Sequence, residues 1–187
     1  MSGRLVILDR DGVINHESDA FVKSPAEWVP IEGSVEAIVR LRDAGFTVAV
    51  ATNQSGIARK LLDLPTLEAI HRKFRGLVKD AGGDVGRIVF CPHHPEDDCD
   101  CRKPEPGLFL RLSRQYGVPL NGVPMIGDSE RDIAAAQAAG GRPILVLTGN
   151  GEKTAEVFAR REELVETYDD LSTAATKIIT DDKDRSG

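Results

Sequence analysis

Residues 5–15 read Leu-Val-Ile-Leu-Asp-Arg-Asp-Gly-Val-Ile-Asn (LVILDRDGVIN), an apolar run that ends on two aspartates. The run lacks the apolar–polar alternation of a half-exposed strand, so we predict a strand buried on both faces, as in a parallel sheet covered by helices. Asp9 and Asp11 directly follow this strand, and at extended spacing their side chains project to the same side. The stretch therefore predicts an α/β fold with two carboxylates at the end of its first strand.

Short apolar strands alternate with amphipathic helices along the rest of the chain. Further strands are predicted over residues 46–51, 87–90, 123–126 and 144–147, and helices over residues 34–43, 65–81, 106–116, 132–139 and 170–179. This order predicts a doubly wound parallel sheet with helices on both faces, in a single domain over residues 1–180. No stretch is long enough for a cap domain, and the polar residues 181–187 are expected to form a disordered tail.

Composition narrows the possible partners and locations. The chain has 187 residues, of which 41% are hydrophobic, and a net charge of -6. The negative charge argues against a nucleic-acid surface, which is normally basic. No apolar run approaches the ~20 residues of a membrane helix, and the first residues lack the apolar stretch of a secretory signal. We expect a cytoplasmic protein without membrane or nucleic-acid partners, and a monomer.

Polar residues follow the other predicted strands at the same edge of the sheet: Thr52, Asn53, Lys103 and Asp128. Ligands of open α/β sheets bind at the carboxyl ends of the strands, so these side chains should meet Asp9 and Asp11. Adjacent carboxylates repel unless a cation lies between them, and magnesium prefers oxygen ligands. The pattern predicts a site for magnesium and a phosphate group, with helix-capping or turn roles for the aspartates as the alternative.

A second cluster lies within residues 91–101, which read CPHHPEDDCDC. The spacing C-x-H-x5-C-x-C brings three thiols and one imidazole together, and such a set forms a closed, tetrahedral structural zinc site. The predicted zinc ligands are Cys91, His93, Cys99 and Cys101. His94 is left as a spare loop residue, and the alternative is a group of free core cysteines beside a surface histidine.

Four segments, LDRDGVIN, VATNQS, CRKPEPG and IGDSERD, resemble in this order the four motifs of the haloacid dehalogenase (HAD) superfamily of phosphotransferases. The resemblance implies a magnesium-dependent phosphatase with an aspartyl-phosphate intermediate. Asp9 is then the nucleophile and Asp11 the general acid, while Thr52 holds the phosphoryl oxygens and Lys103 neutralises charge. Magnesium is then bound by the carboxylates of Asp9 and Asp128 and by the backbone carbonyl of Asp11. Asp132 supports Lys103 or a metal-bound water.

Three further segments narrow the resemblance to one branch of that superfamily: NHESDAFVKSPAEWVPIEGS, TNQSGIAR and the cysteine-rich loop resemble the heptose-1,7-bisphosphate 7-phosphatases. This implies removal of the C7 phosphate of D-glycero-D-manno-heptose 1,7-bisphosphate during synthesis of nucleotide-activated heptose for bacterial surface polysaccharide. It also implies that the substrate-binding residues include Arg102, His16, Asn53, Gln54 and Ser55.

Two alternatives stay open. A histidinol-phosphate phosphatase has the same type of zinc loop, but its substrate is cationic, whereas Arg102, Lys23 and Arg59 favour a second anionic group. A zinc-stabilised binding module with an inactive phosphatase core is the alternative from another class. His71 falls on a charged helix face and is predicted to be solvated.

Overall fold

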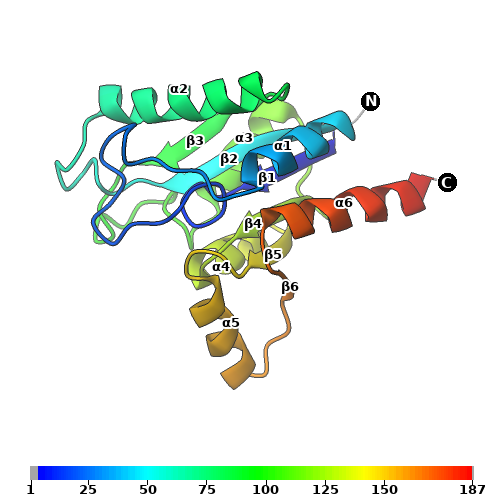
Figure 1. Ribbon diagram of the computed structural model, residues 1–187. Coiled ribbons are helices and arrows are strands. Elements are labelled where there is room, and N and C mark those ends of the chain that lie inside the picture. Colours follow the sequence, from blue (N-terminus) through cyan, green and yellow to red (C-terminus); the bar gives the residue numbers. More distant parts are fainter. Residues whose placement is uncertain (1–3, 187) are drawn as a thin grey trace.

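A single parallel sheet forms the centre of the protein (Figure 1). The computed structural model describes the backbone of residues 4–186 and the side chains of residues 4–184. Within that part the strand order is β3-β2-β1-β4-β5-β6. The strands are β1 (Arg4–Leu8), β2 (Phe46–Asn53), β3 (Ile88–Cys91), β4 (Pro124–Gly127), β5 (Arg142–Val146) and β6 (Glu166–Tyr168). The order reverses between β1 and β4, and such a reversal places the ligand site at the carboxyl ends of these two strands.

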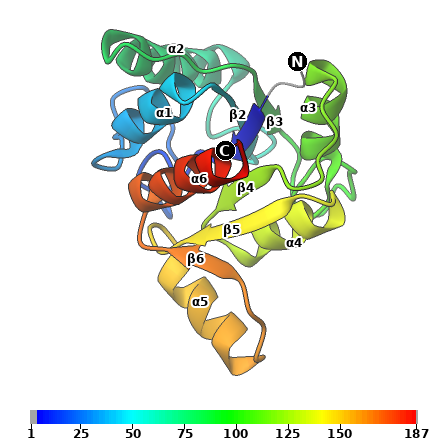
Figure 2. The same ribbon diagram turned by 90° about the vertical axis from the view of Figure 1, so that its right-hand side faces the viewer.

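Helices cover both faces of this sheet (Figures 1 and 2). One face carries α1 (Ser34–Asp43), α2 (Leu64–Asp80) and α6 (Leu171–Ser186), and the other carries α3 (Gly107–Tyr116) and α4 (Glu130–Ala138). Helix α5 (Gly151–Arg160) packs near β5, where Phe158 contacts Leu145 and Ile133. The predicted doubly wound α/β fold is confirmed.

Alternate residues of β1 decide which helices the strand contacts. Val6 and Leu8 belong to the apolar cluster with α1, α2 and α6, whereas Leu5 and Ile7 belong to the cluster with α3 and α4. All four side chains are at most 3% exposed. The strand is therefore buried on both faces, which explains why its sequence is apolar without alternation.

The structure differs from the sequence prediction at two places near the C-terminus. Helix α5 and strand β6 were not predicted, because β6 is only three residues long and α5 is rich in charge. Residues 181–186 continue helix α6 instead of forming a disordered tail, and Gly187 lies outside the described residues. Asp181 holds this last part of α6 in place, because it accepts a hydrogen bond from Arg142 at 2.8 Å and forms an ion pair with Lys177 at 2.5 Å.

Three loops at the carboxyl edge of the sheet are long enough to build a site. They span residues 9–33 after β1, residues 54–63 after β2 and residues 92–106 after β3. None of the described helices has both the length and the apolar character needed to cross a membrane.

Candidate active site

The predicted catalytic residues converge on one cavity at the sheet reversal. Its volume is about 340 Å³, and its walls come from the loops after β1, β2, β3 and β4. It is lined by the four residues predicted for catalysis (Asp9, Asp11, Thr52 and Lys103), by the predicted magnesium ligand Asp128 and by the predicted supporting residue Asp132. Residues that are up to 123 positions apart in sequence are thus brought to one edge, as the parallel topology predicts.

Lys103 lies at the base of this cavity and is 2% exposed. Its Nζ is 3.0 Å from Oδ1 of Asp9 and 2.5 Å from Oδ1 of Asp132, and it donates to the carbonyl oxygen of Ala51 at 2.9 Å. Burial alone would lower the pKa of Lys103, but the charges of Asp132 and Asp9 outweigh it and raise the pKa to about 12. The ammonium therefore keeps its charge and its position between two carboxylates.

The loop that carries Lys103 is fixed by Asn53. The Asn53 side chain accepts a hydrogen bond from the backbone N–H of Lys103 at 3.1 Å and donates to its carbonyl oxygen at 3.0 Å. We expected Asn53 to bind substrate; it does line the cavity, but both ends of its amide hold the Lys103 backbone. Asp132 is used in a similar way, because Oδ2 caps helix α4 through Ser129 while Oδ1 faces Lys103.

Three carboxylates form a candidate cation site. One oxygen each from Asp9, Asp128 and Asp132 lies within 4.8 Å of the others. Burial raises the pKa of Asp9 to about 7, with Lys103 opposing and Asp132 and Asp11 adding to the rise. Burial also raises the pKa of Asp128 to about 8, reinforced by Asp9 and Asp132. A divalent cation would lower both pKa values, and an all-oxygen donor set suits magnesium.

Asp11 is surrounded by hydrogen-bond donors. The Arg10 guanidinium forks onto its carboxylate, with Nη2 2.9 Å from each oxygen. Asn15 Nδ2 donates to Oδ1 at 2.9 Å and Gln54 Nε2 donates to Oδ2 at 2.8 Å. Burial would raise the pKa of Asp11, but Arg10 and the hydrogen bonds from Asn15 and Gln54 outweigh it and lower the pKa. The carboxylate is thus fixed two residues from Asp9 and favoured in its charged form.

Arg10 is buried and its other nitrogen, Nη1, lies 3.4 Å from Nε2 of His71 on α2. The prediction that His71 is solvated is wrong, because α2 packs this side chain against the Arg10 guanidinium and leaves it 9% exposed. Burial lowers the pKa of His71 to about 3, and the Arg10 charge adds to this effect. A neutral imidazole therefore supports Arg10, an arrangement that the helix pattern did not indicate.

The remaining predicted substrate residues divide into two groups. Gln54, Ser55 and Arg102 line the cavity, and Gln54 also donates to the Thr52 hydroxyl at 2.9 Å. His16 is exposed and is not among the lining residues; its neighbour Glu17 takes that place in the wall. Sequence reasoning also missed Asn150, which follows β5 and donates a backbone N–H to Asp128 Oδ2 at 2.8 Å.

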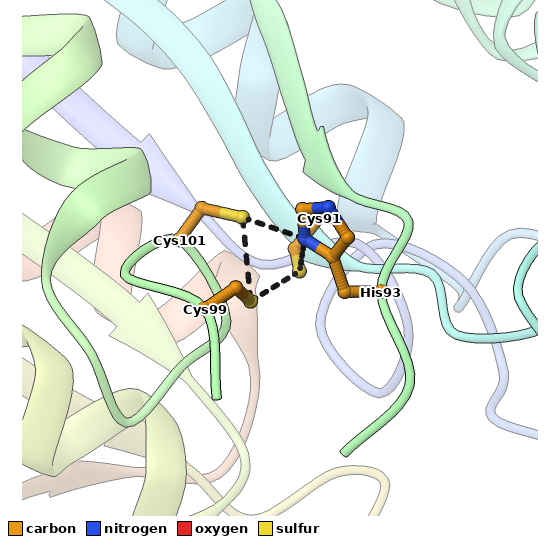
Figure 3. Close-up of side chains that lie close together, drawn as sticks. All are labelled: Cys91, His93, Cys99 and Cys101. Carbon is orange, nitrogen blue, oxygen red and sulfur yellow. Dashed lines mark hydrogen bonds between the residues drawn. The ribbon is translucent and has the colours of Figure 1, made fainter. Parts of the chain in front are cut away.

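The four predicted zinc ligands lie together at the end of β3 and on the loop that follows it (Figure 3). Sulfur–sulfur distances are 3.6 Å for Cys91–Cys99 and 3.7 Å for Cys99–Cys101. Nδ1 of His93 is 3.5 Å from Cys91 Sγ and 3.3 Å from Cys101 Sγ. A tetrahedral zinc site has edges of about 3.8 Å between sulfurs and about 3.6 Å between sulfur and nitrogen, given its usual bond lengths. The cluster therefore has the size and donor set of a zinc site.

Comparisons with known proteins show that the chain is similar to phosphatases of one family. Residues 100–174 match the HAD-hydrolase-like family model. The chain is 53% identical over 176 residues to the D-glycero-beta-D-manno-heptose-1,7-bisphosphate 7-phosphatase of Pseudomonas putida. The aligned region covers 94% of this chain and 99% of that relative. It is 56% identical over 151 residues to the enzyme of the same name from Bordetella bronchiseptica, with coverage of 81% of this chain and 84% of that relative.

A solved structure is also similar over nearly the whole chain. The crystal structure of D,D-heptose 1,7-bisphosphate phosphatase from B. bronchiseptica, complexed with magnesium and phosphate, superposes with a TM-score of 0.91 at 49% identity. The match covers 95% of this chain and 99% of that one.

Proposed function

This chain is a phosphatase that belongs to the D-glycero-beta-D-manno-heptose-1,7-bisphosphate 7-phosphatase family of HAD-like hydrolases, and we propose that it removes the C7 phosphate of that sugar bisphosphate. The observation that carries the proposal is the group formed by Asp9 and the buried side chains of Lys103 and Asp128 at the sheet reversal. A carboxylate nucleophile beside a fixed cation is what phosphoryl transfer through a covalent intermediate requires.

In the first step the Asp9 carboxylate attacks phosphorus, and the bond between phosphorus and the C7 oxygen breaks. Within the described structure, Oδ1 of Asp9 accepts from Arg10 N at 2.7 Å and faces Lys103, whereas Oδ2 has no hydrogen bond and is available for attack. Asp11 gives a proton to the leaving C7 oxygen. Its surroundings favour the carboxylate when no substrate is bound. The negative charge of the bound phosphate group opposes this effect by raising the pKa of Asp11, so that the side chain can carry this proton. The products of this step are an aspartyl phosphate and the sugar with its C1 phosphate retained.

In the second step a water molecule attacks the aspartyl phosphate. Asp11, now a carboxylate, accepts the proton of this water, so the same side chain serves both steps. The bond between Asp9 and phosphorus breaks, which restores the Asp9 carboxylate and releases inorganic phosphate. Thr52 and Lys103 hold the phosphoryl oxygens and offset their charge, because electrostatic positioning dominates catalysis of this reaction.

Magnesium would be held by the carboxylates of Asp9 and Asp128 and by the backbone carbonyl of Asp11. The excess of negative charge in this buried donor set, expressed in the raised pKa values of Asp9 and Asp128, fits a divalent cation. When bound, it offsets the charge on the phosphoryl oxygens. Zinc would be held by Cys91, His93, Cys99 and Cys101 as a closed structural site. Four protein ligands leave no coordination position open for substrate. Zinc would therefore stabilise the loop and would not bind the phosphate.

Arg102 is the residue we assign to the second phosphate, at C1. It lines the cavity directly after the zinc ligand Cys101, and its Nη1 is buried with no hydrogen-bond partner within the described residues. Arg59 and Arg131 line the same cavity. A planar guanidinium with a free nitrogen suits bidentate recognition of a phosphate.

Location in the cytoplasm, a monomeric state and the absence of nucleic-acid partners stay predictions from the sequence.

The test is a substrate panel assayed with and without magnesium. We expect kcat/KM to be highest for the beta anomer of the heptose bisphosphate, with phosphate released from C7 alone. Histidinol phosphate and a simple aryl phosphate serve as comparisons. Preference for histidinol phosphate would replace the substrate assignment, and no phosphate release from any substrate would favour an inactive binding module.

A further inference from the structure

The loop after β5 lies outside the four motifs, yet it holds the carboxylate assigned to the cation. Asn150 donates its backbone N–H to Oδ2 of Asp128 at 2.8 Å, and its side-chain Nδ2 lies 3.3 Å from the same oxygen. The hydroxyl of Thr154 donates to the backbone carbonyl oxygen of Asp128 at 2.9 Å. Within the described residues, the other carboxylate oxygen, Oδ1, accepts no hydrogen bond and is left for the cation.

The same Asn150 amide reaches a second carboxylate across the cavity wall. Its Nδ2 also donates to Oε2 of Glu17, which lies on the loop after β1 and lines the cavity. An amide NH₂ group has two hydrogens, so one side chain can serve both carboxylates. Asn150 therefore stands between a residue of the proposed cation site and a residue of the substrate wall.

Close packing shows that this loop has little freedom. The hydroxyl of Thr148 donates to the carbonyl oxygen of Gly12 at 2.6 Å. Gly149 has φ +61, and a Cβ placed there would lie 2.3 Å from Asp128 Oδ2 and 2.6 Å from the Cα of Gly12. Backbone approaches this close exclude any side chain at position 149. The loop is thus fitted against Asp128 and the first loop at once.

We propose that Asn150 is a positioning residue that couples cation binding at Asp128 to the placement of the substrate wall at Glu17. The inference rests on the proposed function, because Asp128 must be a magnesium ligand. Loss of the Asn150 side-chain amide removes this donor from Glu17 and leaves the Asp128 carboxylate held by the Asn150 backbone N–H alone. Partners that orient metal ligands in this way typically contribute about 10- to 100-fold to metal affinity or activity.

The first experiment measures magnesium binding to the full-length, substrate-free protein by calorimetry. Asn150→Ala keeps the backbone N–H and removes only the amide, so we expect about tenfold weaker binding. We also expect a raised KM for the substrate at saturating magnesium, with a smaller change in kcat. An unchanged dissociation constant for magnesium would overturn the inference.

A second variant tests the steric part of the proposal. Gly149→Ala should weaken magnesium binding by about 100-fold, since the new Cβ displaces Asp128. Gly117→Ala is the matched control, because Gly117 has a similar φ of +65 with no atom near its Cβ position. It should lose stability to backbone strain but keep magnesium affinity. Equal magnesium affinities in the two variants would count against the loop's role.

The coupling itself is tested by a double-mutant cycle with Glu17→Gln and Asn150→Ala. We expect their effects on magnesium affinity to be non-additive, since both act through one amide. Additive effects would refute the coupling. Asp128→Asn separates this inference from the proposed function: if that variant binds magnesium as the parent does, the proposed cation site fails. If it loses magnesium while Asn150→Ala does not, only the further inference fails.

Discussion

The carboxylate cluster and the cysteine–histidine cluster are assembled in opposite ways. Asp9, Asp128 and Asp132 come from the ends of two strands and the start of a helix, and the buried charge of Lys103 lies against two of them. The four soft ligands come from eleven consecutive residues, which begin at the last residue of β3 and continue into the loop after it. The first cluster depends on a finished sheet, whereas the second depends on local spacing and on the metal it would bind. A site can therefore be predicted from the sequence for two different physical reasons.

The two clusters are linked through Lys103 despite this difference. Arg102 and Lys103 directly follow the last predicted zinc ligand, Cys101. The Lys103 backbone is held from the other side by Asn53 on β2. The position of the catalytic ammonium is thus set jointly by the sheet and by the loop, and variants in either region should affect it differently.

Asp9→Asn should give the largest effect, because an amide cannot form the acyl phosphate. We expect kcat to fall on the order of 10⁴-fold or more, as for removal of other covalent nucleophiles. The melting temperature should stay close to that of the parent, since the sheet does not depend on this charge. Steady-state kinetics and thermal unfolding measure the two outcomes. Turnover near the parental rate would exclude the nucleophile assignment.

Cys99→Ser should instead lower stability and activity together, because zinc would be a structural part of the loop. We expect the loss of about one zinc per chain and about 3 kcal/mol of stability, a scale typical of losing a structural metal or disulfide. Elemental analysis and thermal unfolding provide the measurements. His94→Gln is the control, since His94 is not part of the cluster. A variant that melts and turns over like the parent would show that the loop needs no metal.

Arg102→Ala probes the point where the two regions join. We expect kcat/KM for the bisphosphate to fall, and the fall should correspond to a loss of about 1–3 kcal/mol in transition-state binding, the range of charged hydrogen bonds. A sugar with only the C7 phosphate should lose much less, because it has no second anion to recognise. Equal losses on the two substrates would assign Arg102 to the loop rather than to specificity.

His71→Gln should have the smallest effect, and only in acid. The pKa of His71 is about 3 in the folded protein, whereas an unperturbed histidine has a pKa of 6.5. Below pH 6.5 the unfolded chain therefore binds more protons than the folded one. The free energy of unfolding of the parent therefore falls as pH drops from 6.5 towards 3. His71 accounts for a loss of about 1.4 kcal/mol per pH unit over this range. Glutamine does not titrate, so urea unfolding of the variant between pH 7 and pH 5 should show a shallower decline. Parallel pH profiles would mean that His71 is not buried as a neutral group.

Much of the site could be predicted because its residues occupy recurring places. Asp9, Asp11 and Asp128 follow apolar strands, and parallel topology alone brings those strand ends to one edge. The four soft ligands are close in sequence, so their meeting needs no knowledge of the fold. His71 could not be predicted in the same way, since its helix face is charged and only packing against Arg10 makes it buried.

By itself the sequence determined the alternation of strands and helices, the strand-end carboxylates and the spacing of the cysteine–histidine loop. Only the tertiary structure decided that Asn53 holds Lys103, that Asn150 bridges Asp128 and Glu17, and that residues 181–186 are helical. The physical reason is the range of the interactions. Apolar runs and ligand spacings are local patterns, whereas the Asn150–Glu17 bond joins residues 133 positions apart and exists only once the sheet has brought its loops together.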